Sequence, residues 1–229
     1  MLTTGPFGSA NFGGAVTQGR VLAVIWDFGG VITSSPFEAF ARFERERGLP
    51  QDFLRRVNAT NPLDNAWARF ERSAIDLAAF DDAFAAESAA LGHAVRGREV
   101  IALLGGTIRP AMVEALRRLR PRLKIGLITN NVIGPGTEGA DASGRDAVIA
   151  LFHQVIESAK VGVRKPDPAI YQMMCAALAV APQHCVFLDD LGINLKPARA
   201  LGMQTIKVSD PDEALQQLEV LVGFALRGG

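Results

Sequence analysis

The sequence predicts an α/β protein with an open parallel β-sheet as its core and a block of helices inserted into that core. Two observations lead to this fold class. Several short runs are apolar on both faces, as strands buried inside a parallel sheet are, and helical patterns lie between most of them. A chain that alternates strand and helix in this way is expected to form a sheet with right-handed crossovers.

The strands are expected where the apolar runs lie. The first run, VLAVIW, contains no polar side chain, which suits a strand inside a parallel sheet. Four further runs have a similar character. The predicted strands are residues 21–26, 123–128, 154–156, 185–188 and 204–208.

Three core helices are marked by their first or last residues. Pro110 is expected to begin a helix, because proline is well accommodated in a first turn. Asp167 is expected to cap a second helix over 168–180. A third helix is expected from Asn194 to Leu201, since Gly202 is a good helix stop.

The segment 35–106 interrupts this alternation. It contains no strand-like run, and the stretches PFEAFARFERERG, NAWARFERSA and LAAFDDAFAAESAALG are helical in pattern. The sequence therefore predicts a helical cap domain at 35–106, inserted into a core domain of 21–34 and 107–229. Residues 1–20, rich in Gly, Ser and Thr, are expected to be a flexible tail, and the glycine-rich stretch 134–147 a loop.

Composition narrows the function classes. Lys plus Arg and Asp plus Glu both total 24, so a nucleic-acid binder with a broad basic face is not expected. No stretch of 18 or more apolar residues exists, so no membrane span is expected. Cys175 and Cys185 lie among apolar residues and are expected to be reduced and buried, which is typical of a cytoplasmic protein.

Four polar segments follow predicted strands. Asp27 follows the first strand, and TNN begins at residue 129, after the second. VGVRKPDPAIY begins at residue 161 and LDDLGINLKPARALGM at residue 188. Open parallel sheets bind their ligands at the carboxyl ends of strands, so we expect these four segments to meet at one site.

The acidic residues of these segments indicate a nucleophile and a metal. A carboxylate such as Asp27 can act as a nucleophile. Asp189 and Asp190 add negative charge, and carboxylates that crowd one cleft repel each other unless a cation lies among them. Because the candidate ligands are oxygens and no His/Cys set is present, Mg²⁺ fits best.

The remaining polar residues suit an anionic substrate. Gly29 and Gly30 allow a ligand to approach the backbone closely and offer it amide groups. Thr129 and Asn130 can donate hydrogen bonds to anionic oxygens. Lys165 can neutralise the carboxylates and hold a phosphate as a point charge.

DFGGV, TNN, VGVRKPDPAIY and LDDLGINLKPARALGM resemble, in order and spacing, the four motifs of the haloacid dehalogenase superfamily, over roughly residues 21–210. The last motif is most similar to the phosphatase domain at the amino terminus of mammalian soluble epoxide hydrolase. DFGGV also resembles the related domain of some acyl-CoA dehydrogenase family proteins. The resemblance implies a Rossmann-like core with a helical cap inserted after the first strand.

The resemblance also implies a mechanism. Asp27 would be the nucleophile of an Mg²⁺-dependent hydrolase of small phosphate monoesters and would form an aspartyl-phosphate. The metal would be held by the Asp27 carboxylate, the Gly29 carbonyl and Asp190, with Asp189 close by.

The same resemblance gives the substrate contacts. Thr129 and Lys165 would steady the transferring phosphoryl group, and Asn130 would contact the substrate, as would the Gly29–Gly30 backbone. The expected partner is a small phosphorylated substrate, with neither nucleic acid nor a membrane, and a homodimer is left open.

One position departs from the family pattern. Phosphatases of this family usually carry a second Asp two residues after the nucleophile, where this chain has Gly29. General acid–base help is worth ~10²–10⁴-fold in rate. We therefore expect a slow phosphatase, one limited to good leaving groups, or one that borrows an acid from the cap or the substrate. Glu71 and Asp64 are cap candidates, and Trp67 faces either the cap core or the substrate cleft.

Alternative functions follow from the same departure. The 2-haloacid dehalogenases also lack the second Asp, but they need no metal, and the LDD motif argues against them. A phosphonatase of the Schiff-base type needs a cap lysine, and residues 35–106 contain none. A non-catalytic module that binds a phosphorylated ligand or docks to a protein stays open.

Overall fold

The protein is described by a computed structural model, which covers residues 20–131 and 142–227. Five parallel strands form one sheet in the order β3-β2-β1-β4-β5. The strands are β1 (Ala23–Trp26), β2 (Lys124–Thr129), β3 (Gln154–Glu157), β4 (Cys185–Asp189) and β5 (Gln204–Lys207). All five expected strands are confirmed, with their ends within two residues of the prediction.

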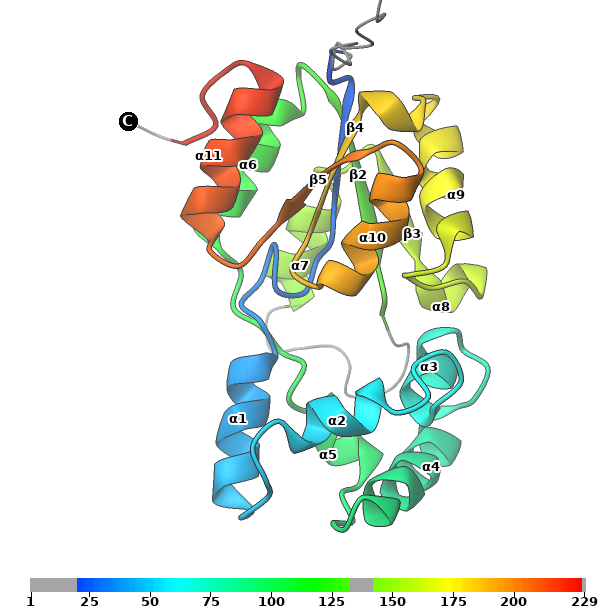
Figure 1. Ribbon diagram of the computed structural model, residues 1–229. Coiled ribbons are helices and arrows are strands. Elements are labelled where there is room, and N and C mark those ends of the chain that lie inside the picture. Colours follow the sequence, from blue (N-terminus) through cyan, green and yellow to red (C-terminus); the bar gives the residue numbers. More distant parts are fainter. Residues whose placement is uncertain (1–19, 132–141, 228–229) are drawn as a thin grey trace, which may run out of the picture.

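Helices cover both faces of this sheet (Figure 1). One apolar cluster joins the sheet to α6, α7 and α11, and a second joins its other face to α9 and α10. The core helices are α6 (Pro110–Leu119), α7 (Ala142–Ile149), α8 (Ser158–Val161), α9 (Pro168–Leu178), α10 (Gly192–Ala200) and α11 (Pro211–Val222), with a short 3₁₀ turn at Pro182–His184.

The three helices expected in the core are confirmed, with shifted ends. α6 begins at Pro110 as expected, and the Asp167 side chain caps α9 by accepting a hydrogen bond from the Ala169 amide (2.9 Å). α9 ends at Leu178, because Ala179 adopts a left-handed conformation. α10 begins at Gly192, two residues before the expected start.

The loop expected at 134–147 is wrong in its last part. α7 begins at Ala142, so the final residues of the expected loop are helical. The reason is packing: Val148 is buried against the core cluster together with Phe152. The earlier part of the expected loop, like the tail expected at 1–20 except Arg20, lies outside the described residues.

The inserted segment consists of five helices around its own apolar cluster. This cluster contains Phe40, Phe53, Phe70, Phe80 and Phe84. The helices are α1 (Phe37–Glu46), α2 (Phe53–Ala59), α3 (Ala66–Glu71), α4 (Leu77–Ala90) and α5 (Gly97–Ile101). The three expected helical stretches correspond to α1, α3 and α4, whereas α2 and α5 were not expected.

The inserted helices lie over the carboxyl ends of the strands (Figure 1). The segment that enters the inserted helices and the segment that leaves them run side by side. An isolated antiparallel bridge between Thr33 and Ile108 joins the two segments. The Ser34 amide also donates to the Thr107 carbonyl (2.8 Å). We call residues 35–106 the cap, and these boundaries adjoin the paired segments.

Two expectations from composition can be compared with the structure. Cys175 and Cys185 are free and buried, with their sulfur atoms 4.0 Å apart, as expected. In the part of the chain that the structure describes, no helix is both long and apolar enough to cross a membrane.

Candidate active site

The carboxyl ends of the central strands bring the acidic residues together. Trp26 of β1 pairs with Leu188 of β4, and the Asp27 amide continues this ladder by donating to the Leu188 carbonyl (2.9 Å). Asp27 and Asp189 therefore leave adjacent strands at the same level. Asp27 is 8% exposed and Asp189 is fully buried.

Three carboxylates and one ammonium form the centre of the site. Asp27, Asp189 and Asp190 each offer an oxygen within 4.8 Å of the others. The Lys165 ammonium lies 2.8 Å from Asp27 Oδ1 and 2.8 Å from Asp189 Oδ2. Four residues expected to belong to the site thus lie close together, although they come from three separate segments of the chain.

Lys165 is buried and held by Asn130. The Lys165 amide donates to Asn130 Oδ1 (2.8 Å), and Asn130 Nδ2 donates to the Lys165 carbonyl (2.9 Å). This reciprocal pair fixes the lysine backbone beside the end of β2. The Asn130 side chain is therefore occupied in holding Lys165, and its expected contact with substrate stays a prediction.

Asp189 has a full set of partners. Its Oδ1 accepts from the Leu191 amide (2.8 Å) and from Asn194 Nδ2 (3.0 Å). Its Oδ2 accepts from Lys165 (2.8 Å) and again from Asn194 (3.1 Å). Since both oxygens are engaged, Asp189 anchors Lys165, and Asp27 and Asp190 are the carboxylates with more freedom to bind a cation.

The two carboxylate oxygens of Asp27 differ in their partners. Its Oδ1 accepts from the Phe28 amide (2.6 Å) and pairs with Lys165. Among the described residues, no hydrogen bond or ion pair uses Oδ2. A carboxylate fixed through one oxygen can direct the other toward a ligand.

Burial and like charges raise the pKa of the acidic groups. Burial, together with the like charges of Asp189 and Asp190, raises the pKa of Asp27 to about 8 against the opposing effect of Lys165. Burial and Asp189 raise the pKa of Asp190 to about 6. Although burial alone would lower the pKa of Lys165, the two carboxylates outweigh it and raise that pKa, so the lysine is charged.

The two glycines that follow Phe28, Gly29 and Gly30, have different surroundings. Gly30 has a φ of +74°, and a Cβ there would overlap the Asp190 carboxylate, so a side chain is excluded. At Gly29 a Cβ would meet nothing within 4 Å. There is therefore space for a β-carbon at position 29, where the family pattern leads one to expect an aspartate, and a clash at that atom does not explain its absence.

Arg109 holds the turn that follows Asp27, and this contact was not predicted from the sequence. Its guanidinium donates to the Gly30 carbonyl (2.7 Å), and its charge lowers the pKa of Asp190 against the effects of burial and Asp189. It belongs to none of the four motifs. The only local signal is its place just before Pro110 at the start of α6.

Thr129 is the last residue of β2 and is buried. Because β2 pairs with β1, this residue lies one strand away from Asp27. Its expected contact with a phosphoryl group stays a prediction.

The two cap carboxylates that were candidate acids differ in position. The Asp64 side chain is 70% exposed and pairs only with Arg72 (3.5 Å) among the described residues. Glu71 is buried, its Oε2 lies 2.6 Å from Arg164 Nε, and its Oε1 accepts from Trp67 Nε1 (2.8 Å). Burial raises the pKa of Glu71 against the opposing effect of Arg164.

The Trp67 ring packs within the cap. It makes edge contacts with Phe80 and Phe84, with ring centres 5.7 and 6.4 Å apart. Of the two expected positions for this side chain, the structure shows the cap core.

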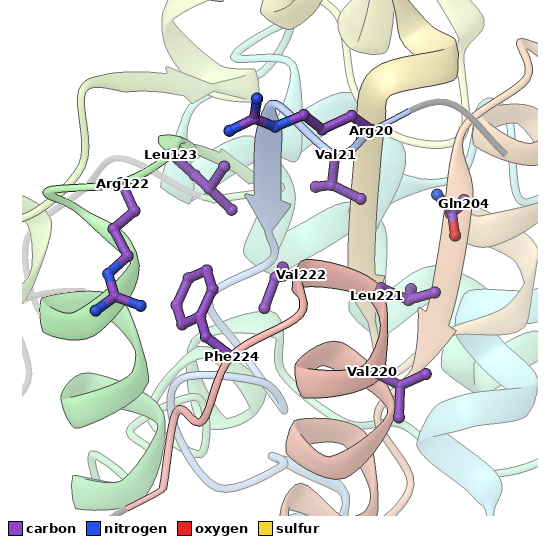
Figure 2. Close-up of a pocket in the computed structure, with 9 residues that line it drawn as sticks. All are labelled: Arg20, Val21, Arg122, Leu123, Gln204, Val220, Leu221, Val222 and Phe224. Carbon is purple, nitrogen blue, oxygen red and sulfur yellow. The ribbon is translucent and has the colours of Figure 1, made fainter.

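A cavity of about 590 Å³ lies at the opposite end of the sheet (Figure 2). Residues just before β1 and β2 line it together with the end of α11. Arg122 lies over the Phe224 ring at 4.5 Å, and none of the described residues that line the cavity is acidic. The groups capable of nucleophilic and metal chemistry are therefore at the carboxyl edge, away from this cavity.

The structure defines an α/β protein with three carboxylates and a buried lysine gathered at the carboxyl edge of its sheet. The chain belongs to the haloacid dehalogenase-like hydrolase family, whose model matches residues 21–202.

Named relatives agree with this assignment. The chain is 32% identical over 217 residues to acyl-CoA dehydrogenase family member 10 of Mus musculus and 32% identical over 217 residues to bifunctional epoxide hydrolase 2 of Sus scrofa. These matches cover 90% and 89% of the chain but only 20% and 39% of those two proteins. Phosphatase MT3486 of Mycobacterium tuberculosis is 30% identical over 196 residues, covering 82% of the chain and 87% of the relative.

Solved structures share the fold. An enzyme of the same family from Bacteroides thetaiotaomicron, in complex with magnesium and inorganic phosphate, matches with a TM-score of 0.54 at 20% identity, covering 82% of this chain and 93% of that one. The L-2-haloacid dehalogenase of Xanthobacter autotrophicus, with chloropropionic acid covalently bound, matches with a TM-score of 0.58 at 21% identity, covering 88% and 83%. The resemblance to the epoxide hydrolase domain and to the acyl-CoA dehydrogenase relative is confirmed at the level of sequence.

Proposed function

We propose that this chain hydrolyses small phosphate monoesters with Mg²⁺ bound, through a covalent phosphoryl group on Asp27. The observation that carries the proposal is the arrangement of three carboxylates around one shared lysine. Asp27, Asp189 and Asp190 lie within 4.8 Å of one another, and Lys165 bridges two of them. The relative named as a phosphatase supports the substrate class.

The residues present fit Mg²⁺. Three carboxylates face one buried ammonium, so the site carries an excess of negative charge, and the pKa values of Asp27 and Asp190 are raised as a result of burial and that excess. All candidate ligands are oxygen atoms, which Mg²⁺ prefers. Asp27, Asp190 and the Gly29 carbonyl would hold the ion, which when bound would neutralise charge on the transferring phosphoryl group.

The residues of the chain would divide the reaction between them. Asp27 Oδ2 attacks phosphorus, the bond from phosphorus to the ester oxygen breaks, and the leaving oxygen takes a proton. Water then attacks phosphorus, inorganic phosphate leaves, and the Asp27 carboxylate is restored. Lys165, Thr129 and the Gly29–Gly30 backbone would stabilise the phosphoryl oxygens in both steps.

Gly29 limits the leaving group. With no side chain at position 29, the proton for the leaving oxygen comes from water or from the substrate itself. Esters of acidic alcohols such as aryl phosphates need that proton least, so we expect them to be the better substrates.

The test is phosphate release from p-nitrophenyl phosphate and a broad panel of phosphate monoesters, with and without Mg²⁺. We expect Mg²⁺ to stimulate release and Asp27→Asn to abolish it. Activity equal in the wild type and in Asp27→Asn across the panel contradicts the proposal. Halide release from 2-haloacids without metal would instead establish a dehalogenase.

Gly29 also supports a second candidate, a non-catalytic module that binds a phosphorylated ligand. Because a β-carbon at this position would meet no atom within 4 Å, Gly29→Asp can be used to distinguish the two functions. If the natural chain is a slow phosphatase, this variant should raise the rate on poor leaving groups by ~10²-fold or more. Activity that appears only in the variant, with none in the natural chain, favours the binding module.

A further inference from the structure

We propose that Glu71 and Arg164 are positioning residues through which the cap holds Lys165 in place, so that docking of the cap and placement of the lysine are one event. The proposal rests on the phosphatase function above for its kinetic consequences, but its structural part can be tested without activity. Neither residue belongs to the carboxylate cluster.

The first step is an ion pair that crosses from cap to core. Glu71 ends α3 of the cap, and Arg164 lies in the core segment between α8 and α9. Arg164 Nε lies 2.6 Å from Glu71 Oε2, and the two side chains are 17% and 8% exposed. An ion pair so sheltered from water is screened little and constrains its partners more than a surface pair does.

Other contacts dock the same two surfaces. Arg164 also donates to the Pro62 carbonyl of the cap (3.0 Å), and Ser73 Oγ donates to the Ala159 carbonyl of α8 (2.9 Å). One stretch of cap on either side of α3 therefore binds one core segment, 159–164.

The second step runs from Arg164 to the nucleophile. Arg164 directly precedes Lys165, whose backbone is held by Asn130 and whose ammonium contacts Asp27 and Asp189 at 2.8 Å. A shift of the Arg164 backbone is therefore a shift of Lys165. Because Lys165 has two fixed acceptors, even a small displacement weakens one of its contacts.

The third step ties Glu71 to the interior of the cap. Its other oxygen accepts from Trp67 Nε1 (2.8 Å), and the Trp67 ring packs on Phe80 and Phe84. The contacts thus form an unbroken series from the aromatic cluster of the cap, through Trp67, Glu71 and Arg164, to Lys165. A contiguous series can carry coupling between two sites, and a double-mutant cycle measures whether it does.

The kinetic test compares Glu71→Gln, Arg164→Gln and the double variant on p-nitrophenyl phosphate with Mg²⁺. A displacement of about 1 Å at a catalytic group can cost 10²-fold in rate. We expect each single variant to lower kcat at least tenfold with a smaller change in KM, and the double variant to be no slower than the slower single variant. Arg164→Lys, which keeps the charge, should recover part of kcat.

Asp82→Asn is the matched control. It removes the charge of an exposed cap carboxylate that pairs with Arg96 of the cap, so kcat should stay at the wild-type value. Losses in the two single variants that multiply in the double variant overturn the proposal. So does a loss confined to Glu71→Gln with disappearance of one limb of the pH profile, which would identify Glu71 as the acid of the reaction.

Hydrogen exchange separates this proposal from the proposed function. In Glu71→Gln, amides of residues 158–165 should exchange faster together with those of α3, while the α4 amides stay unchanged. Trp67→Phe, which keeps an aromatic side chain but removes the indole N–H donor, should give the same pattern more weakly. Faster exchange in α3 alone overturns the proposal, whether or not the protein hydrolyses any phosphate ester.

Discussion

Two buried carboxylates, Asp81 in the cap and Asp27 in the core, have pKa values shifted in opposite directions. Asp81 Oδ1 accepts from the Arg98 amide (2.9 Å), and its Oδ2 accepts from Arg98 Nε (2.7 Å) and Arg96 Nε (3.0 Å). Burial would raise its pKa, but these hydrogen bonds outweigh it and lower the pKa to about 2. Asp81 therefore accepts hydrogen bonds from two arginines.

The core has the reverse balance. Asp27 shares a single lysine with Asp189 and also faces Asp190, and burial with these like charges raises its pKa to about 8. A cap carboxylate with surplus donors holds the fold together. A core cluster with surplus acid is less stable than it could be, and such unbalanced groups are typical of functional sites.

The largest change in stability that tests this contrast is expected for Lys165→Met, which removes the cation shared by two carboxylates. Breaking a buried ion pair leaves uncompensated charge, so we expect the free energy of unfolding to fall by about 3–5 kcal/mol. Urea denaturation at pH 7 measures it. Lys160→Met is the control, because the exposed Lys160 ammonium is solvated and its pair with Glu157 should contribute less than about 1 kcal/mol. Equal losses in both variants would mean that Lys165 does not compensate the cluster.

A smaller effect is expected for Asp81→Asn in the cap. The arginines it leaves are partly exposed and can be solvated, so we expect a loss of about 2–3 kcal/mol at pH 7. Because folding lowers this pKa, the stabilisation is present above about pH 4 and is lost as the pH falls toward 2. Denaturation curves at pH 7, 4 and 2.5 should show the difference between the variant and the wild type shrinking.

Asp82→Asn is the neighbouring control. Its side chain is 75% exposed and it pairs with Arg96, so its removal should change stability much less. A difference between Asp81→Asn and the wild type that stays constant down to pH 2.5 would show that the aspartate acts through its shape and not its charge.

Some features of the fold could be predicted from the sequence and others could not. The strands and the four motifs were predictable, because apolar runs and turn residues are local and parallel strands bring their carboxyl ends together. Short helices fixed by distant groups were not. α2 begins where Glu44 accepts from the amides of Asp52 and Leu54 (both 2.9 Å), a contact that no periodicity reveals.

The same limit applies to the site. That Asp27, Asp190 and Lys165 would meet followed from strand order and motif spacing. Three other contacts depend on side-chain directions across segments far apart in the chain. They are the hydrogen bonds of Asn130 with the Lys165 backbone, the hydrogen bond from Arg109 to the Gly30 carbonyl, and the ion pair of Glu71 with Arg164. Such contacts are set by packing, and sequence patterns do not encode them.

The smallest expected effect is a gain of stability from Asp27→Asn in the presence of a chelator. Because folding raises the pKa of Asp27 from 3.8 to about 8, we expect the native protein between about pH 4 and pH 8 to hold a proton there that the unfolded chain has lost. Wild-type stability should therefore fall as the pH rises from about 4 to about 8, and the asparagine variant should lack this fall.

At pH 8 we expect the variant to be more stable than the wild type, and at pH 5 the gain should be smaller. Thermal unfolding in EDTA at the two pH values measures the difference. Added Mg²⁺ should then stabilise the wild type and not the variant, because the ion takes the place of the proton among the carboxylates. A variant that is less stable than the wild type at pH 8 without metal would show that Lys165 compensates all three carboxylates, and the contrast with Asp81 would then fail.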